Sequence, residues 1–121
     1  MKIDRQAVFN KYNGHCAYCG DVLLPKKWQV DHKWPKALAH LRPDYDIDSP
    51  ENLMPSCTKC NIHKHGMPLD RLDYVAGGWR VVLSKQLSML KKNAQFDRAL
   101  RFKQIIIEEK PIVFYFERFK G

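Results

Sequence analysis

The fold of this chain depends on the stretch Cys57-Thr58-Lys59-Cys60. An earlier stretch with the same spacing reads Cys16-Ala17-Tyr18-Cys19, and the chain has four cysteines in total. Two residues between cysteines allow both sulfurs of a pair to face one metal ion, so two pairs supply a tetrahedral set of four ligands. The sequence therefore predicts a structural Zn²⁺ bound by Cys16, Cys19, Cys57 and Cys60, because zinc suits thiolates and brings no redox chemistry. One alternative is disulfide bonds, which a reducing compartment disfavours. The other is a redox-active Cys-x-x-Cys motif, which needs only one cysteine pair and so leaves the second, matched pair unexplained.

The length of the chain limits what it can be. With 121 residues and 14.2 kDa, it is expected to form one compact domain, too short for a barrel enzyme or a doubly wound nucleotide-binding enzyme. Its longest apolar run covers residues 112–116, which cannot span a bilayer, and the N-terminus lacks the apolar stretch of a signal peptide. We therefore expect a soluble cytoplasmic protein with no membrane partner.

Positive charge is concentrated in the last third of the chain. The formal net charge is +8, of which residues 80–121 carry +6 and residues 1–79 carry +2. Such a charge favours a polyanion as partner, although charge alone does not separate DNA from RNA or an anionic membrane. A solvated helix face explains the same charge equally well.

The first half of the chain predicts an α+β fold. A helix is expected over residues 4–12, capped by Asp4 and stopped by Asn13-Gly14. Short strands are expected over 22–24 and 28–32, joined by a turn at 25–27. Residues 34–47 are expected to be a loop that can hold a helical turn, Ser49-Pro50 should begin a short helical turn, and the second cysteine pair should run into a helix ended by Gly66.

The second half predicts helices and a terminal hairpin. Leu83, Leu87, Leu90 and Ala94 lie on one helix face, which indicates core packing. Asn93 can interrupt this helix before a second helical piece over 96–103. The β-branched and aromatic runs at 105–107 and 112–116 favour a hairpin. We expect one domain over 1–121, with a core over about 12–66 and a basic C-terminal extension over about 67–121.

Several polar residues around the cysteine pairs fit phosphodiester hydrolysis. That reaction needs a proton acceptor for the attacking water, and a neutral His such as His32 can serve near neutral pH. Asp31 and Asn61 offer oxygen ligands to a hard divalent cation, and His65, four residues after Asn61, can add a nitrogen. Asn52 has the donors and the acceptor to pin the loop between them.

Simpler readings stand beside these assignments. Asp31 can form a surface salt bridge, Asn61 can cap a helix, and His65 can be a plain exposed residue. Because neighbours on a strand point to opposite faces, Asp31 and His32 reach one phosphate only if a bend follows, which Pro35 makes plausible.

The same residues, in this order, resemble the HNH endonucleases, in the ββα-metal variant with two cysteine pairs. The matching text covers about residues 12–66 and reads Cys16-x-x-Cys19-Gly20, Val30-Asp31-His32-x-x-Pro35, Ser49-Pro50-Glu51-Asn52-Leu53-x-Pro55-x-Cys57-x-x-Cys60-Asn61 and then Lys64. Taken together in this order, these motifs are a highly specific signal for the family, whereas each motif alone is a weak signal.

The resemblance implies an activity and a set of roles. It implies His32 as general base, Asn52 as the residue that orients the base and its loop, and Asn61 as a metal ligand together with Asp31. Asn61 stands where many members have His, which favours Mg²⁺ or Mn²⁺ as the catalytic cation; His65 matches a further ligand of some relatives. The implied reaction is metal-dependent hydrolysis of DNA, leaving a 5′-phosphate and a 3′-hydroxyl.

The sequence leaves other outcomes open. A catalytically inactive, zinc-stabilised nucleic-acid-binding module is the main alternative, and a protein-interaction domain is a weaker one. The 19 residues between His32 and Asn52 form a long insertion that can shape a DNA groove or be a plain surface loop. The partner is expected to be duplex DNA, and a homo-oligomer is compatible with the sequence. The basic residues expected to contact the DNA backbone are Lys33, Lys59, Lys64, Arg80, Lys85, Lys91, Lys92, Arg98, Arg101 and Lys103.

Overall fold

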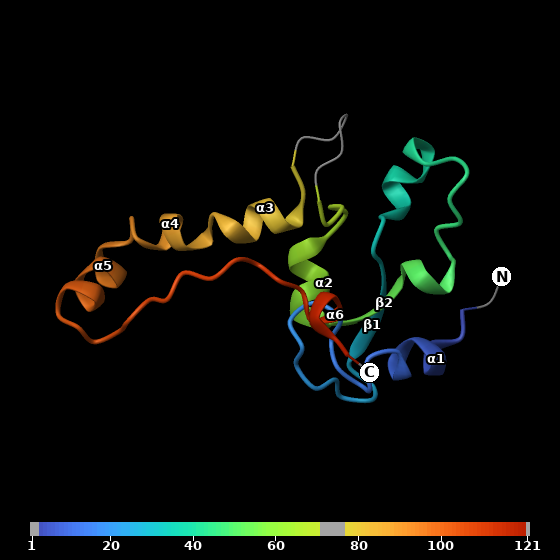
Figure 1. The fold of residues 1–121 in the computed structure, drawn as a ribbon, viewed down its shortest axis with the longest axis horizontal. Helices are drawn as coiled ribbons and strands as arrows, with labels where there is room; N and C mark the ends of the chain where they lie inside the picture. Colours follow the sequence, from blue (N-terminus) through green and yellow to red (C-terminus); the bar gives the residue numbers. More distant parts are fainter. Residues whose placement is uncertain (1–2, 71–76, 121) are drawn as a thin grey trace. The chain divides into compact units, whose positions relative to one another are not determined.

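The computed structural model describes residues 3–70 and 77–120, which form two compact units (Figure 1). Unit 1 takes in residues up to 69 and from 113 onward, and unit 2 takes in residues 70–112. The elements of unit 1 are α1 (Arg5–Asn10), β1 (Trp28–His32), the 3₁₀ helices η1 (Lys36–Leu41) and η2 (Pro50–Asn52), β2 (Leu53–Cys57), α2 (Thr58–Lys64) and α6 (Tyr115–Arg118). Those of unit 2 are α3 (Trp79–Ser84), α4 (Gln86–Leu90) and α5 (Ala94–Arg101). The prediction of an α+β fold is confirmed.

The sheet of unit 1 consists of β1 and β2, paired antiparallel, with His32 opposite Leu53 and Trp28 opposite Cys57. β1 lies where the sequence predicts it, but its predicted partner is wrong. Residues 22–24 form no strand, and Val22 makes only an isolated bridge with His15. β2 is hard to predict because Pro55 lies within it and because its first four residues are all buried, so that no polar–apolar alternation marks it.

The helices next to the sheet agree with the sequence. The Asp4 side chain caps α1 by accepting a hydrogen bond from the Ala7 amide at 3.1 Å. Asn13 and Gly14 then take φ values of 54° and 79°, which lie outside the range of a right-handed helix, so the helix cannot continue through them. α2 begins directly after β2 and packs against both strands, so the second cysteine pair joins sheet to helix. The small hydrophobic core around these elements includes Val8, Cys16, Ala17, Tyr18, Leu23, Trp28, Trp34, Leu53, Met54, Leu69 and Phe114.

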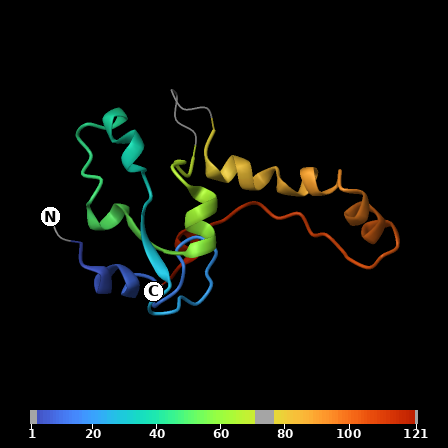
Figure 2. The same ribbon diagram turned by 180° about the vertical axis from the view of Figure 1, so that it is seen from behind.

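The predicted C-terminal hairpin is wrong: residues 105–114 contain no strand, and α6 follows. The chain instead returns to the turn of the first cysteine pair (Figure 2), where the Tyr115 and Phe116 amides donate to the carbonyls of Tyr18 and Ala17. Phe114 is buried and meets Tyr18 edge to face at 5.6 Å. Packing of these aromatic rings in unit 1 therefore overrides their preference for a strand. Gly20 is required here because a Cβ would lie 2.7 Å from the Tyr115 ring.

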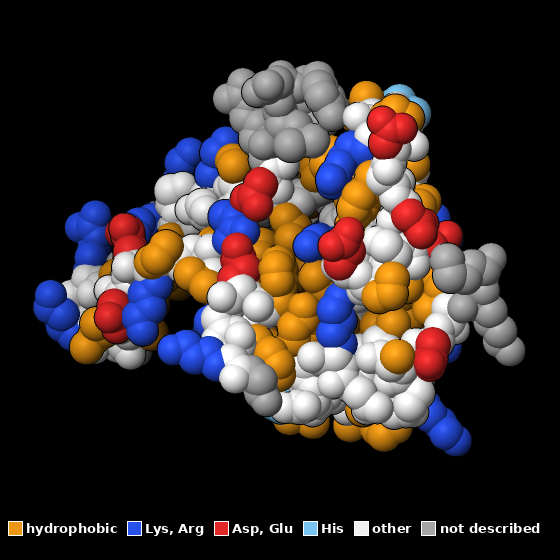
Figure 3. Space-filling view, turned by 45° about the vertical axis from the view of Figure 1, so that its right-hand side comes forward, with side chains coloured by type: hydrophobic (Ala, Val, Ile, Leu, Met, Phe, Trp, Pro, Cys, Tyr) orange, Lys and Arg blue, Asp and Glu red, His pale blue; other side chains and the backbone are white. Residues whose placement is uncertain are grey.

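Unit 2 is helical, as predicted, with the break at Asn93 that the sequence indicates. The Asn93 side chain caps α5 by accepting from the Phe96 amide at 3.1 Å. The expected buried leucine face is not formed: the helix divides into α3 and α4, and Leu90 is 45% exposed. Basic and acidic side chains lie close together at the left of Figure 3. Several basic side chains of this unit pair with carboxylates, and the pairs are Arg80–Asp70, Lys91–Glu109, Arg101–Asp97 and Lys110–Glu108.

None of the helices within residues 3–70 and 77–120 combines the length and the apolar character that crossing a bilayer requires.

Candidate metal centre and active site

The four cysteines come together in unit 1. Their sulfurs all lie within 4.8 Å of one another, the Sγ atoms of Cys19 and Cys57 are 3.8 Å apart, and all four thiols are free of disulfides. A tetrahedral zinc with Zn–S bonds of about 2.3 Å places its sulfurs about 3.8 Å apart. The predicted grouping is confirmed, and the cluster is placed to bind one zinc ion.

Backbone structure holds the cysteines in this arrangement. The first pair sits in a tight turn closed by hydrogen bonds from the Cys16 amide to the Asp21 carbonyl and from the Gly20 amide to the Cys16 carbonyl. Cys57 ends β2, and Cys60 lies in the first turn of α2, where its amide donates to the Cys57 sulfur at 3.4 Å. A metal at this point would therefore join the first turn to both β2 and α2.

The charges of the sulfurs are strongly interdependent. The pKa of the Cys16 thiol is lowered to about 4, mainly by a hydrogen bond from Cys60 and further by backbone amides such as that of Cys57. Burial, reinforced by the Cys16 charge, raises the pKa of Cys19 to about 12, and the bond to Cys16 raises the pKa of Cys60. Four neighbouring thiols thus resist losing all their protons together, whereas a divalent cation would stabilise all four thiolates.

The predicted base, His32, ends β1 and meets an acidic residue of the insertion. Its side chain is 12% exposed, and its Nε2 lies 2.8 Å from Oδ1 of Asp48, whose side chain is 38% exposed. The hydrogen bond from His32 is the main reason why the pKa of Asp48 lies below its usual value. Asp48 is therefore ionised at neutral pH beside the imidazole.

Asn52 is completely buried and ties two loop segments together. Its Oδ1 accepts from the Trp34 amide at 2.7 Å, while its Nδ2 donates to the carbonyls of Trp34 (3.1 Å) and Ile47 (2.7 Å). The Asn52 carbonyl also accepts from the Lys33 amide at 2.8 Å. Every donor and acceptor of this side chain is thus engaged with backbone, the kind of loop contact for which its chemistry is suited.

Asp31 lies in a buried polar network. Its Oδ2 accepts from the Tyr18 hydroxyl at 2.5 Å and forms an ion pair with Nζ of Lys64 at 3.0 Å. Lys64 also donates to the His32 carbonyl at 3.0 Å. Burial lowers the pKa of Lys64 and, together with Asp31, raises that of Tyr18 well above its usual value.

The network corrects one sequence expectation. Lys64 has no exposed side-chain surface, so it does not reach the backbone of bound DNA in this conformation. Its role is to neutralise Asp31 inside the protein.

Asn61 and His65 lie on and just after α2. Asn61 is half-buried, and its carbonyl accepts from the amide of the exposed His65, which takes a φ of 52° at the end of the helix. Within the described residues, the cysteines are the one group of three or more His, Cys, Asp and Glu side chains whose ligand atoms converge. Asp31, His32 and His65 therefore do not form such a group, and their ligand and catalytic roles stay predictions.

The comparison with known families agrees with this arrangement. Residues 16–66 match the HNH endonuclease family. This HNH segment begins at Cys16 and contains both cysteine pairs, β1, β2 and α2, so the resemblance found in the sequence is confirmed over these residues. The match indicates a nuclease-type or nucleic-acid-associated function. Neither the curated proteins nor the solved structures include a match to the chain.

Three contacts of the HNH segment were not anticipated from the sequence. Tyr18 lies between two cysteines and Asp48 lies in an insertion, and no periodic pattern marks either of them. Lys64 carried a weak signal, because it lies three residues after Asn61 and hence near the same side of α2, which faces the sheet.

Replacing Lys64 with Met should destabilise the zinc-loaded protein by about 3–5 kcal/mol, because the Asp31 carboxylate would stay buried without its cation. Urea unfolding measures the change. Lys59→Met, at an exposed position of the same helix, is the matched control and should change stability little. Adding Asp31→Asn to Lys64→Met should recover part of the loss, and full stability of the Lys64→Met protein would contradict the buried ion pair.

Proposed function

We propose that this protein is a metal-dependent DNA endonuclease that hydrolyses phosphodiester bonds and leaves a 5′-phosphate and a 3′-hydroxyl. The observation that carries the proposal is the HNH match over residues 16–66, which contains His32 at the end of β1 and Asn52 beneath the following loop. The cysteine cluster would bind zinc as a structural clamp, and residues 12–66 would form the nuclease core of a single domain.

His32 would act as the general base. An imidazole accepts a proton near neutral pH, and its position at a strand end, partly open to solvent, leaves access for a water molecule. Asn52 would support the base indirectly by holding the backbone near both ends of the insertion, at Trp34 and Ile47.

Asp31 and Asn61, with His65 as a third candidate, would hold the catalytic cation. One carboxylate and one amide oxygen suit Mg²⁺ or Mn²⁺, which keep several water ligands. Bound there, the cation would neutralise charge on the phosphate and the leaving oxygen. Because Oδ2 of Asp31 already accepts two hydrogen bonds, cation binding would use the other oxygen or displace one donor.

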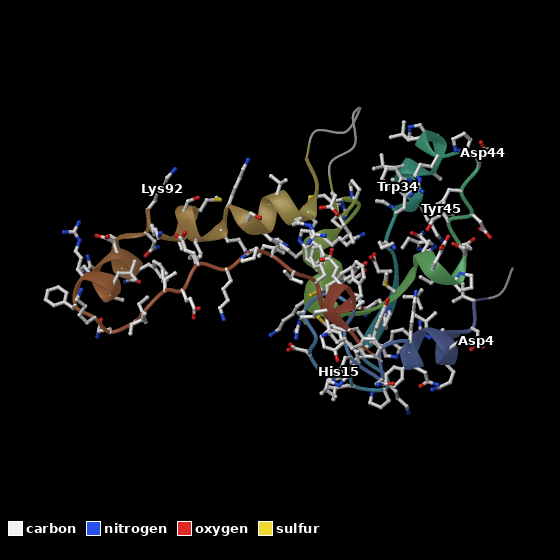
Figure 4. All side chains as sticks on the ribbon, viewed as in Figure 1. Asp4, His15, Trp34, Asp44, Tyr45 and Lys92 are labelled. Atoms are coloured by element: carbon white, nitrogen blue, oxygen red, sulfur yellow. The ribbon has the colours of Figure 1, made fainter. Side chains whose placement is uncertain are left out.

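Duplex DNA is the proposed substrate. Unit 2 carries exposed basic side chains, and Lys92 points away from the ribbon in Figure 4. Contacts of this kind with phosphates hold a duplex without reading its sequence. The thiols of the zinc site suit a reducing compartment such as the cytoplasm.

The second candidate is an inactive nucleic-acid-binding module. It is favoured by the ion pair between Asp31 and Lys64, in which an ammonium group already occupies the carboxylate that a catalytic cation would need. Both candidates keep the structural zinc and the basic surface, so cleavage is the property that separates them.

A plasmid cleavage assay on zinc-loaded protein tests the proposal. Supercoiled DNA is incubated with added Mg²⁺, with Mn²⁺, or with EDTA for a time short enough that the zinc content stays constant. We expect nicked or linear DNA with either cation and none with EDTA, and ligation should confirm 5′-phosphate ends. Salt-sensitive binding without cleavage under all conditions would favour the inactive module.

A further inference from the structure

The insertion between β1 and β2 brings one carboxylate to the candidate base. Asp48 lies 16 residues after His32, and its Oδ1 is 2.8 Å from Nε2 of the imidazole. We propose that Asp48 is a positioning residue for His32: by accepting a hydrogen bond from the Nε2–H group, it fixes the ring and leaves Nδ1 as the atom that takes a proton from water. This inference rests on the proposed nuclease function.

The chemistry of the two groups fixes the direction of the hydrogen bond. An ionised carboxylate can only accept, so Nε2 of His32 must carry the proton. A neutral imidazole has one protonated and one unprotonated nitrogen, so Nδ1 then holds the free lone pair. The lowered pKa of Asp48 agrees with this, since it keeps the carboxylate ionised at neutral pH.

The loop that carries Asp48 is held from two sides. Nδ2 of Asn52 donates to the carbonyl of Ile47, directly before Asp48, and to the carbonyl of Trp34, two residues after His32. The Asp48 amide also donates to Oδ1 of Asp46 at 3.0 Å, which fixes the turn. The same buried amide thus ties together the segments that carry the base and the carboxylate.

The rest of the insertion is braced by stacked side chains. The Arg42 guanidinium lies 4.0 Å from the ring centre of Tyr45 and 5.3 Å from that of Trp34. Figure 4 shows Trp34 beside the helical segment η1, and Tyr45 and Asp44 on the side of the returning loop. The insertion therefore has internal packing that can hold a short contact in place, as a positioning role requires.

The first test reads the ring itself and needs no nuclease activity. Long-range ¹H–¹⁵N spectra of the zinc-loaded protein at about pH 8, above the ordinary pKa of His, report which ring nitrogen carries the proton. We expect His32 to be protonated at Nε2 alone in the wild type, and a mixture of tautomers with faster exchange of the ring proton in Asp48→Ala. Asp44→Ala, at an exposed site in the same insertion, should leave the spectrum unchanged. A wild-type ring protonated at Nδ1 would overturn the proposal.

The second test reads cleavage. Asp48→Ala should lower kcat by about 10- to 100-fold with little change in KM, since the partner that orients a reacting group is lost while DNA contacts remain. Asp48→Asn keeps an acceptor oxygen without the charge, so its kcat should lie between that of Asp48→Ala and that of the wild type. The kcat of Asp44→Ala should match the wild-type value. Equal kcat in wild type and Asp48→Ala overturns the positioning role. A wild type without any cleavage refutes the proposed function instead, and the ring spectra then decide whether Asp48 sets the tautomer.

Discussion

His32→Ala is expected to lower the rate of DNA cleavage by about 10²- to 10⁴-fold, the contribution typical of a general base. The imidazole is the group at the end of β1 that can take a proton from water near neutral pH, and alanine offers no substitute. DNA binding and zinc content should persist, because the substitution leaves the four cysteines and the basic side chains of unit 2 unchanged. Initial rates of plasmid nicking, together with filter binding to the same DNA, measure the two properties separately.

The control for this experiment is another histidine of the insertion. His40→Ala removes an exposed imidazole from η1 and should cleave like the wild type. Thermal unfolding of both variants verifies that each stays folded. Wild-type cleavage by His32→Ala would refute the assignment of the base, and a common loss of activity in both variants would point to the insertion as a whole rather than to the ring.

Cys57→Ser is expected to unfold unit 1 under conditions in which the wild type is stable. Structural zinc contributes about 10–16 kcal/mol of apparent binding free energy in small zinc domains, which is most or all of their stability. Cys57 ends β2 and also caps α2 through its sulfur, so its loss releases sheet and helix together. The core around these elements is small, and it has little other cross-linking to replace the metal.

Thr58→Ala is the matched control, since Thr58 is the exposed neighbour of Cys57 and all four sulfurs remain. Zinc per chain is measured by elemental analysis, folding by amide dispersion in NMR spectra, and free thiols by titration. We expect one zinc per chain in wild type and control, and loss of both zinc and dispersion in Cys57→Ser. A Cys57→Ser protein that keeps one zinc and its native spectrum would contradict the clamp, and a zinc-free wild type without free thiols would show disulfides instead.

Local signals in the sequence predicted local structure well. Asp4 and Asn93 identify helix starts because a short polar side chain can accept from the amide three residues on. The cysteine spacing identified the metal cluster, because two residues between ligands fix the geometry of each pair. In these cases the signal lies in residues that are close in the chain, either a cap and its helix or the two members of one cysteine pair, so local spacing contains the information.

Local sequence signals did not predict which distant segments of the chain pair with one another. The short turn at 25–27 favoured a local hairpin of residues 22–24 with 28–32. In the structure β1 pairs with β2 instead, a segment that contains Pro55 and that the sequence marks only as the residues before the second cysteine pair. The aromatic run around Phe114 has the composition of a strand but packs on Tyr18. In both, tertiary packing outweighs β propensity, which depends on the surroundings of a strand.

The candidate site also has a part that the sequence could predict and a part that it could not. His32, Asn52 and Asp31 could be named from the order of polar residues, but their partners could not. The contact of His32 with Asp48 depends on the path of a 19-residue insertion, and the burial of Lys64 depends on how α2 meets the sheet. A lysine near a candidate site suggests phosphate binding, and its complete burial beside Asp31 follows from three-dimensional packing alone.

The return of the chain to the first cysteine turn has a consequence for how the protein is made. The amides of Tyr115 and Phe116 and the buried ring of Phe114 complete unit 1, yet they follow the whole of unit 2 in the chain. During synthesis, residues around the first cysteine pair leave the ribosome roughly a hundred residues before their aromatic cover does. The HNH segment therefore reaches its finished packing only after translation has passed Phe116, so a prematurely terminated chain would carry the metal ligands without the cover over them.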